Sequence, residues 1–381
     1  MGADPKIHIE DKFQLERWEA MDHFLSETYS PENVWRYRPL FDWMFADREN
    51  NSQANIICAW NGDNLVGTFG YIPCDLFWGN CLHSIKGAWG SNWMTLKEYR
   101  KGCGWVLMRR WGRLFPVVLG QAATSDNLRL APSLGFVIYD RIPRYVGIFD
   151  IDAVYAFMCH GDIKPDPKRI AACLITEDVC QNYDEVIFVE KKIDPKIFSP
   201  NWLKYPALKY GTVRHADYLQ WRYLDHPFFV YQVLVAGDAS TPAVCVYRVE
   251  KTSGAVSTNV GRILELFHSS DEIGREMGCK VLATALHAMK QAGCIFCDFY
   301  CSSLEYGNTV KGFGFVEEIN RILPHRLSPI DFALQGQIHQ NVEFRISAKN
   351  LEAPEGIGAM YITKSDGDQD RPSRGSIRLL L

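Results

Sequence analysis

Long apolar runs are missing from this sequence of 381 residues. The opening residues, MGADPKIHIEDKF, contain none, so we expect no signal peptide, and Lys6 stands where a myristoylation motif has Ser or Thr. No stretch approaches the ~20 apolar residues that cross a bilayer. The sequence therefore predicts a cytoplasmic protein without a membrane partner.

An excess of charge of one sign is also missing. The chain has 41 Lys and Arg against 45 Asp and Glu, a formal net charge of −4. A large basic surface for a nucleic-acid partner is therefore not expected. The hydrophobic content of 47% is that of a globular protein, and the length predicts two or three domains.

Cysteine is plentiful, at 12 residues, but a metal-binding set is not evident. Cys294 and Cys297 have the spacing of a zinc pair, yet CIFCDFYC has the pattern of a strand, on which residues three apart point to opposite faces. No second pair with that spacing follows. We predict no metal site and no disulfides, with many of the cysteines buried as small apolar residues.

A long-period repeat organises the chain. WMFAD, from Trp43, matches WRYLD, from Trp221, and each is followed by a strand, a Gly-Asp turn and a second strand. A third strand, a helix (about 104–114 and 274–292), a fourth strand and a Gly-Phe pair then follow in both copies. Trp43 precedes Gly135 by 92 positions (43 to 135), and Trp221 precedes Gly314 by 93 (221 to 314). The shared order favours a duplicated domain over two unrelated α/β domains.

The stretch EYRKGCGWVLMRRW, Glu98 to Trp111, places two glycines among basic residues before an expected helix. Backbone N–H groups at a helix start attract anions, and glycine lets the backbone approach a ligand closely. The alternative to an anion-binding loop is an ordinary turn before the helix. The matching place in the second copy, SDEIGREMG, lacks the Gly-x-Gly pair, so the repeated fold itself does not require it.

WGSNWMTLKEYRKGCGWVLMRRW and SDNLRLAPSLGF resemble motif A and the downstream segment of the GCN5-related N-acetyltransferase (GNAT) superfamily. The resemblance implies an α/β fold (an α+β mixed sheet) with two tandem GNAT-like domains. It implies that residues 1–150 bind acyl-CoA and that residues 151–335 form a degenerate domain completing the acceptor site. Residues 336–381 would be a C-terminal extension, with a polar tail expected to be mobile from about Lys364.

In this family the loop grips the pyrophosphate of acyl-CoA, and the preceding strand pairs with the pantetheine arm. The resemblance therefore implies acyl-CoA as cosubstrate, with no permanently bound cofactor. The residues implied to contact it are Trp93, Met94, Thr95, Lys101, Gly102, Cys103, Gly104, Trp105 and Asn127.

The sequence departs from the family pattern at two positions of the first copy. Tyr99 stands where the family prefers Arg or Gln, although Arg100 is adjacent, and Ala131 stands where a Tyr often acts as general acid. In the second copy Asp271, Glu272 and Glu276 would repel phosphates, so we expect that copy to have lost CoA binding.

Catalysis would be attack of a neutral amine on the thioester carbonyl, aided by positioning and by donors aimed at the oxyanion. Asn92 lies on the strand implied to hold the thioester, and Asp126 is the candidate base acting through water. The favoured alternative for Asp126 is a helix cap. From the second copy, at most one of Glu265 and His268 is expected to face the site.

The acceptor has no motif of its own. The stretch from Arg214 to Tyr231 is similar in pattern to tandem GNAT enzymes that acylate nucleotide-linked amino sugars, here with dTDP expected. Arg222, Tyr223 and His226 would bind that substrate, through an Arg fork for phosphate and a ring for stacking. The alternative is that they are core or surface residues.

Two other functions remain open. One is a transferase that uses aminoacyl-tRNA or a cell-wall precursor, which the even charge balance does not favour. The other is a non-catalytic scaffold, which Ala131 favours and the retained glycine loop opposes. Exposed edge strands are compatible with a homodimer.

Overall fold

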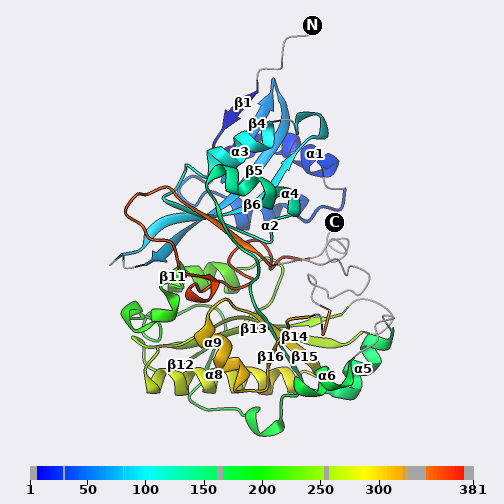
Figure 1. Ribbon diagram of the computed structural model, residues 1–381, viewed down its shortest axis with the longest axis vertical. Coiled ribbons are helices and arrows are strands. Elements are labelled where there is room, and N and C mark those ends of the chain that lie inside the picture. The colour runs from blue at the N-terminus through cyan, green and yellow to red at the C-terminus, as the bar shows by residue number, and fades with distance from the viewer. Residues whose placement is uncertain are drawn as a thin grey trace.

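The computed structural model describes residues 7–28, 31–79, 81, 83–100, 102–160, 166–252, 257–320, 322–324 and 340–372. Two halves, each built on a large mixed sheet, lie one above the other along the long axis (Figure 1). The predicted α/β class with mixed sheets is confirmed. None of the helices in these ranges is long and apolar enough to cross a membrane.

The first half contains three minor strands, four helices and the main strands of one sheet. In chain order these are β1 (His8–Glu10), β2 (Phe13–Gln14), α1 (Trp18–Thr28), α2 (Arg38–Phe45), β3 (Gln53–Ala54), β4 (Ile56–Asn61), β5 (Asn64–Trp78), β6 (Ile85–Thr95), α3 (Cys103–Trp111), β7 (Val117–Gln121), α4 (Ser125–Leu130) and β8 (Val137–Tyr139). One sheet face packs on α1 and α2, and the other on α3.

The second half repeats this order after a linker region. Its elements are β9 (Arg144–Ile148), α5 (Ile151–His160), α6 (Pro167–Ala172), β10 (Ile187–Val189), β11 (Tyr210–Thr212), α7 (Ala216–Leu219), β12 (Gln232–Ala236), β13 (Ala243–Lys251), β14 (Asn259–Phe267), α8 (Glu272–Gln291), β15 (Cys294–Tyr300), α9 (Leu304–Lys311), β16 (Val316–Glu317) and β17 (Val342–Ile346). In both halves the third and fourth main strands, β6 with β7 and β14 with β15, pair in parallel.

The two halves exchange a strand. β9 leaves the first half and lies between β15 and β16, while β17 leaves the second half and lies between β7 and β8. The region 336–381, expected as an extension, therefore supplies a strand to the first sheet. Neither sheet is built from one continuous stretch of sequence.

Trp43 and Trp221, the residues on which the repeat was recognised, contact each other. Trp43 Nε1 donates to the Trp221 carbonyl at 2.9 Å, and Trp221 Nε1 donates to the Trp43 carbonyl at 3.0 Å. Their rings stack with centroids 5.2 Å apart. A reciprocal contact of this kind is characteristic of two-fold related surfaces, so the two copies face each other as a dimer within one chain.

The polar tail is not mobile over the part that the structure describes. Lys364, Asp366 and Asp370 are 3%, 4% and 1% exposed. The C-terminal segment, coloured orange to red, passes between the two halves (Figure 1). The prediction of a mobile tail from Lys364 was wrong there because buried arginines pair with its carboxylates: Arg214 with Asp366, and Arg248 with Asp370.

Candidate functional site

The first part of the candidate site is the glycine loop at the start of α3. Gly102 has φ 105°, in the left-handed region that favours glycine, and a Cβ there would meet no atom within 4 Å. No side chain among the described residues caps the helix at Gly102. Its first N–H groups are therefore available to an anion. Lys101, predicted to belong to this loop, lies outside the described residues.

The packing beneath the loop explains its other residues. A Cβ on Gly104 would lie 3.2 Å from the Trp93 ring, so only a small residue fits there closely. Cys103 is buried against β5, where it faces Gly67, and Trp105 is 38% exposed with Arg109 stacked on its ring. Cys103 and Gly104 thus fix the loop on the sheet, and Trp105 faces outward.

Tyr99, which departs from the family pattern, has a structural partner. Its hydroxyl accepts a hydrogen bond from the Asn61 side chain at 2.8 Å, which ties the loop to the β4–β5 hairpin. Tyr99 therefore supports the glycine loop through this hydrogen bond.

The second part of the site is the gap between β6 and β7. These strands pair over Gly87–Trp89 and Val117–Leu119, and no further pairing follows. Asn92 begins the free end of β6 with φ 50°, where the register with β5 shifts. Asn92 is 7% exposed, and neither its Nδ2 nor its Oδ1 has a hydrogen-bond partner among the described residues. A buried amide without partners is costly and marks a place where a ligand can bind.

Beyond Asn92, the predicted residues of β6 follow the free strand. Trp93, Met94 and Thr95 are partly exposed, and Met94 and Thr95 pair with β5. Their second edge, which would face β7, is unpaired in the described structure. This is the edge on which an extended ligand could add as a pseudo-strand.

The end of β7 is held by a residue from the C-terminal region. Asn341 accepts the Ala123 N–H at 2.9 Å and donates to the Ala123 carbonyl at 3.0 Å. Ala122 has φ 56°, unusual for a residue other than glycine. No local sequence pattern indicates Asn341, because the strand exchange that brings it here joins positions 218 apart.

Asp126 and Asn127 open α4 at the end of this gap. The Asp126 carboxylate is 79% exposed and pairs with Arg129. Thr124 occupies the cap position, so the expected cap by Asp126 is also not made. Asn127 is half-buried on the first turn of α4.

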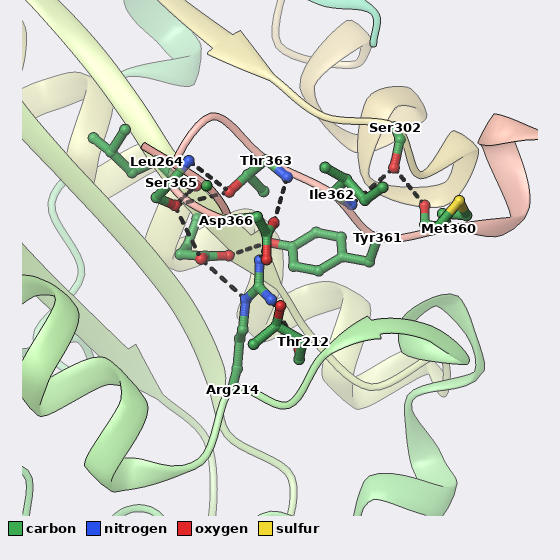
Figure 2. A network of polar contacts seen from close by, with 12 residues as sticks. Thr212, Arg214, Leu264, Ser302, Met360, Tyr361, Ile362, Thr363, Ser365 and Asp366 are labelled. Carbon is green, nitrogen blue, oxygen red and sulfur yellow. Dashed lines mark hydrogen bonds and ion pairs between the residues drawn. The ribbon is translucent and has the colours of Figure 1, made fainter. Parts of the chain in front are cut away.

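A polar network joins the C-terminal segment to the second sheet (Figure 2). Arg214 donates to Glu265 at 3.0 Å and to Asp366 at 2.6 Å, and all three side chains are buried. Tyr361 donates to the second Glu265 oxygen at 2.6 Å. Glu265, a candidate titratable group, is thus fully engaged, and His268 is 1% exposed and packs against Gly278.

The same segment reaches the first sheet at the gap. The Ser91 hydroxyl donates to Asp368 at 2.8 Å, and Gln121 donates to the Thr363 carbonyl at 3.2 Å. Thr363 and Asp368 therefore connect the C-terminal segment to the two strands that border the gap. Sequence reasoning missed Asp368, which is 277 positions from Ser91.

The residues predicted to bind the acceptor have partners within the chain. Arg222 is 1% exposed and donates to the Gly367 carbonyl at 3.0 Å, and the Tyr223 hydroxyl donates to Glu265 at 2.7 Å. Burial lowers the pKa of His226 to about 3, so the ring is neutral, and its Nδ1 accepts the Phe228 and Phe229 N–H groups. None of the three lines either of the described cavities.

The stretch Arg214–Tyr231 nevertheless lines a cavity of about 570 Å³ between the two halves, through His215, Tyr218 and Trp221. Arg48 enters it from the first half and lies 4.3 Å from the Trp221 ring. The Tyr218 hydroxyl is buried without a hydrogen-bond partner among the described residues. Carboxylates and cations share the lining, including Glu49, Asp75 and Lys86.

A second cavity, of about 320 Å³, lies along α3 and is lined by residues of Trp105 to Arg113, by residues of Ser133 to Phe136 and by Arg345. Trp105 lines it together with three cations, Arg109, Arg113 and Arg345. Arg345 donates to the carbonyls of Leu134 and Gly112, and Gly112 and Arg113 follow the last residue of α3, so these cations lie toward the C-terminal end of the helix.

No protein-family model matches the chain, and no curated protein matches it significantly. Solved structures do match along most of its length. N-myristoyltransferase from Saccharomyces cerevisiae, with bound myristoyl-CoA and inhibitors, is 11% identical, with a TM-score of 0.52, over 91% of this chain and 80% of that chain. A GCN5-related N-acetyltransferase from Kribbella flavida is 13% identical, with a TM-score of 0.50, over 90% and 71%.

The chain shares the fold of these two solved structures. A conserved protein of unknown function from Enterococcus faecalis V583 also has it, at 9% identity and a TM-score of 0.51, over 90% of this chain and 72% of that one. At such low identities the likeness establishes the arrangement of elements alone.

Proposed function

We propose that the chain is an acyl-CoA-dependent N-acyltransferase. The observation that carries the proposal is the start of α3, where Gly102 adopts a positive φ and leaves uncapped N–H groups beside the gap between β6 and β7. The yeast structure with the same fold holds myristoyl-CoA, which supports this class of ligand.

In the proposed reaction the amine attacks the thioester carbonyl, the carbon–sulfur bond breaks, and CoA leaves as the thiol. Asn92 is the proposed oxyanion donor, because its amide is buried, unpartnered and next to the gap. We do not assign the base role to Asp126, whose carboxylate is exposed and paired with Arg129.

For the acceptor we propose an amine on a nucleotide-linked sugar, bound in the cavity between the halves. Arg48 has no carboxylate bonded to it in the described structure, so it suits a diphosphate. Lys86 is largely exposed and pairs with Asp75 at 2.9 Å. Glu49, also in the lining, suits an ammonium group or hydroxyls. The dTDP identity rests on the sequence resemblance.

Thermal unfolding with added CoA, acetyl-CoA and myristoyl-CoA tests the cosubstrate. A ligand present at 100 times its Kd adds about 2.7 kcal/mol to the free energy of unfolding. We expect such stabilisation in the wild type and its loss in Gly102→Val, because a Cβ is strained at φ 105° and valine side chains would enter the open space above the loop.

Gly293→Val is the matched control. Gly293 also has a positive φ, of 72°, and open space around it, but it lies in the second half between α8 and β15. It should lose similar stability and keep the CoA response. The proposal fails if no CoA ester stabilises the wild type, or if Gly102→Val still responds fully.

The acceptor proposal has its own test. dTDP and UDP should stabilise the wild type, and Arg48→Ala should lose that response while keeping the response to CoA. An aminoacyl-tRNA or cell-wall precursor acceptor would instead leave both nucleotides without effect.

A further inference from the structure

Glu343 is a buried carboxyl group that the strand exchange brings into the first sheet. It lies on β17, paired with Gly120 of β7 on one side and Ile138 of β8 on the other. The residue is 5% exposed, and its Oε2 atom has no hydrogen-bond partner among the described residues. An unpartnered carboxyl oxygen at this depth is expensive for a fold to keep.

The Glu343 carboxyl group lies over Gly120 of β7. A Cβ built on Gly120 would lie 2.7 Å from Glu343 Oε1, so the glycine makes room for the carboxyl group. Gly120 is the residue directly after Leu119, where the pairing of β7 with β6 ends. Glu343 therefore stands beside the point from which the two strands diverge.

The face of the sheet on which the Glu343 side chain lies is also defined. Val342 and Phe344 belong to the core under α1 and α2, so Glu343 points to the opposite face, that of α3. The proposed CoA loop is on this same face, because α3 begins at the loop. Glu343 and the loop are thus on one side of the gap.

The charged groups on the neighbouring elements have interaction partners other than Glu343. Arg345, the next charged residue on this face of β17, donates to the carbonyls of Leu134 and Gly112. On α4, Asp126 and Arg129 pair with each other at the surface. On α3, Arg110 pairs with Asp11, and Arg109 stacks on Trp105.

The strands on either side add no ionised partner. β7 has no ionisable side chain, and Tyr139 of β8 packs in the core on the other face. Burial raises the pKa of Glu343 to about 7. The group can therefore hold a proton at neutral pH and release it there.

We propose that Glu343 is the general acid that protonates the departing sulfur of CoA. This inference rests on the proposed acyl-CoA function. When the amine attacks, the carbon–sulfur bond breaks and its electron pair goes to sulfur, which takes the Glu343 proton. The proton lost by the amine passes to solvent, and water reprotonates the carboxylate before the next turnover. Ala131, the residue at the family's acid position, has no proton to donate.

The first test is calorimetric titration of the full chain with CoA near pH 7, in two buffers of different protonation enthalpy. Bound CoA removes water from Glu343 and raises its pKa further, so the wild type should take up a fraction of a proton. Glu343→Gln should bind CoA without that uptake. Glu352→Gln, an exposed position on the chain after β17, should behave as the wild type.

The second test measures CoA release from acetyl-CoA with hydroxylamine as a surrogate amine. The wild-type rate should fall as the pH rises through about 7, because the acid form is lost. Glu343→Gln should be slower by about 100-fold or more at low pH and should lack this decline. Glu343→Asp should restore the decline at a reduced rate, which a merely structural residue would not do.

The outcomes separate the two proposals. No CoA binding by the wild type overturns the acyl-CoA function and this inference with it. CoA binding with the same proton uptake and the same pH profile in Glu343→Gln overturns the role of Glu343 alone.

Discussion

Two residues other than glycine have left-handed backbones in the described structure, Asn92 at φ 50° and Ala122 at φ 56°. Asn92 lies on β6 beyond its pairing with β7, and Ala122 directly follows β7. Such conformations cost about 1–3 kcal/mol each and persist where the surrounding structure holds them. Both left-handed residues therefore lie at the gap, where the Asn92 side chain also has no hydrogen-bond partner among the described residues.

The sequence could identify some residues of the candidate site and not others. Gly102, Gly104 and Asn92 stand in local patterns, before a helix and on one strand, so the resemblance found them. Asp368 and Glu343 reach the site through contacts between distant positions, which no local pattern encodes. The hydrogen bond of Arg222 could not be foreseen for a related reason: the Gly367 carbonyl that accepts it lies 145 positions away.

Titration of the single residue Glu343 makes the free energy of unfolding depend on pH. Its pKa is raised from 4.5 to about 7 in the folded protein, so the folded state holds a proton that the unfolded state has lost in this range. The stability contributed by this group is full below about pH 4.5 and is lost as the pH rises to about 7. The difference amounts to about 3 kcal/mol.

Urea unfolding of the wild type and of Glu343→Gln at several pH values checks this prediction. The free energy of unfolding of the variant, relative to the wild type, should rise between about pH 4.5 and pH 7 and stay level above that. A constant difference across the range would mean that Glu343 is ionised like a surface carboxylate.

At the scale of elements, the repeat was visible in the sequence and the strand exchange was not. Each copy shows the same strand and helix order because periodicity and turn residues are local. The apolar pattern of Val342–Ile346 predicts a strand but does not indicate which sheet receives it. Both exchanged strands enter at an equivalent place, after the fourth main strand of the other copy.

β17 should therefore matter to the first half as much as its own strands do. Phe344 is fully buried and packs on Trp78 and Tyr139, which belong to β5 and β8. Phe344→Ala should lower the free energy of unfolding by about 3–5 kcal/mol, since it leaves a cavity in the core under α1 and α2.

Chemical denaturation of Phe344→Ala measures this loss. Val106→Ala, a partly exposed position on α3, is the comparison and should cost less than about 1 kcal/mol. A small effect of Phe344→Ala would mean that β17 is dispensable for the first sheet.

At the scale of the whole molecule, the C-terminal segment closes the interface between the copies. Its carboxylates alternate along the chain, with Asp366 on Arg214, Asp368 on Ser91 and Asp370 on Arg248. One side of the interface is thus polar and buried, and the Trp43–Trp221 stack forms another. Buried ion pairs add little net stability, but breaking one leaves an uncompensated charge.

These connections predict that the two halves unfold together. The first half without β17 would leave β7 and β8 unpaired between them, and the second without β9 would separate β15 from β16. Denaturation followed by tryptophan fluorescence and by far-ultraviolet circular dichroism should therefore give coincident single transitions. A chain of residues 1–150 should fail to fold, because it lacks β17 and carries β9 without its partner strands. Two separate transitions, or a folded fragment with the CoA response of the full chain, would show instead that each copy is an independent domain and that the exchange contributes only to their attachment.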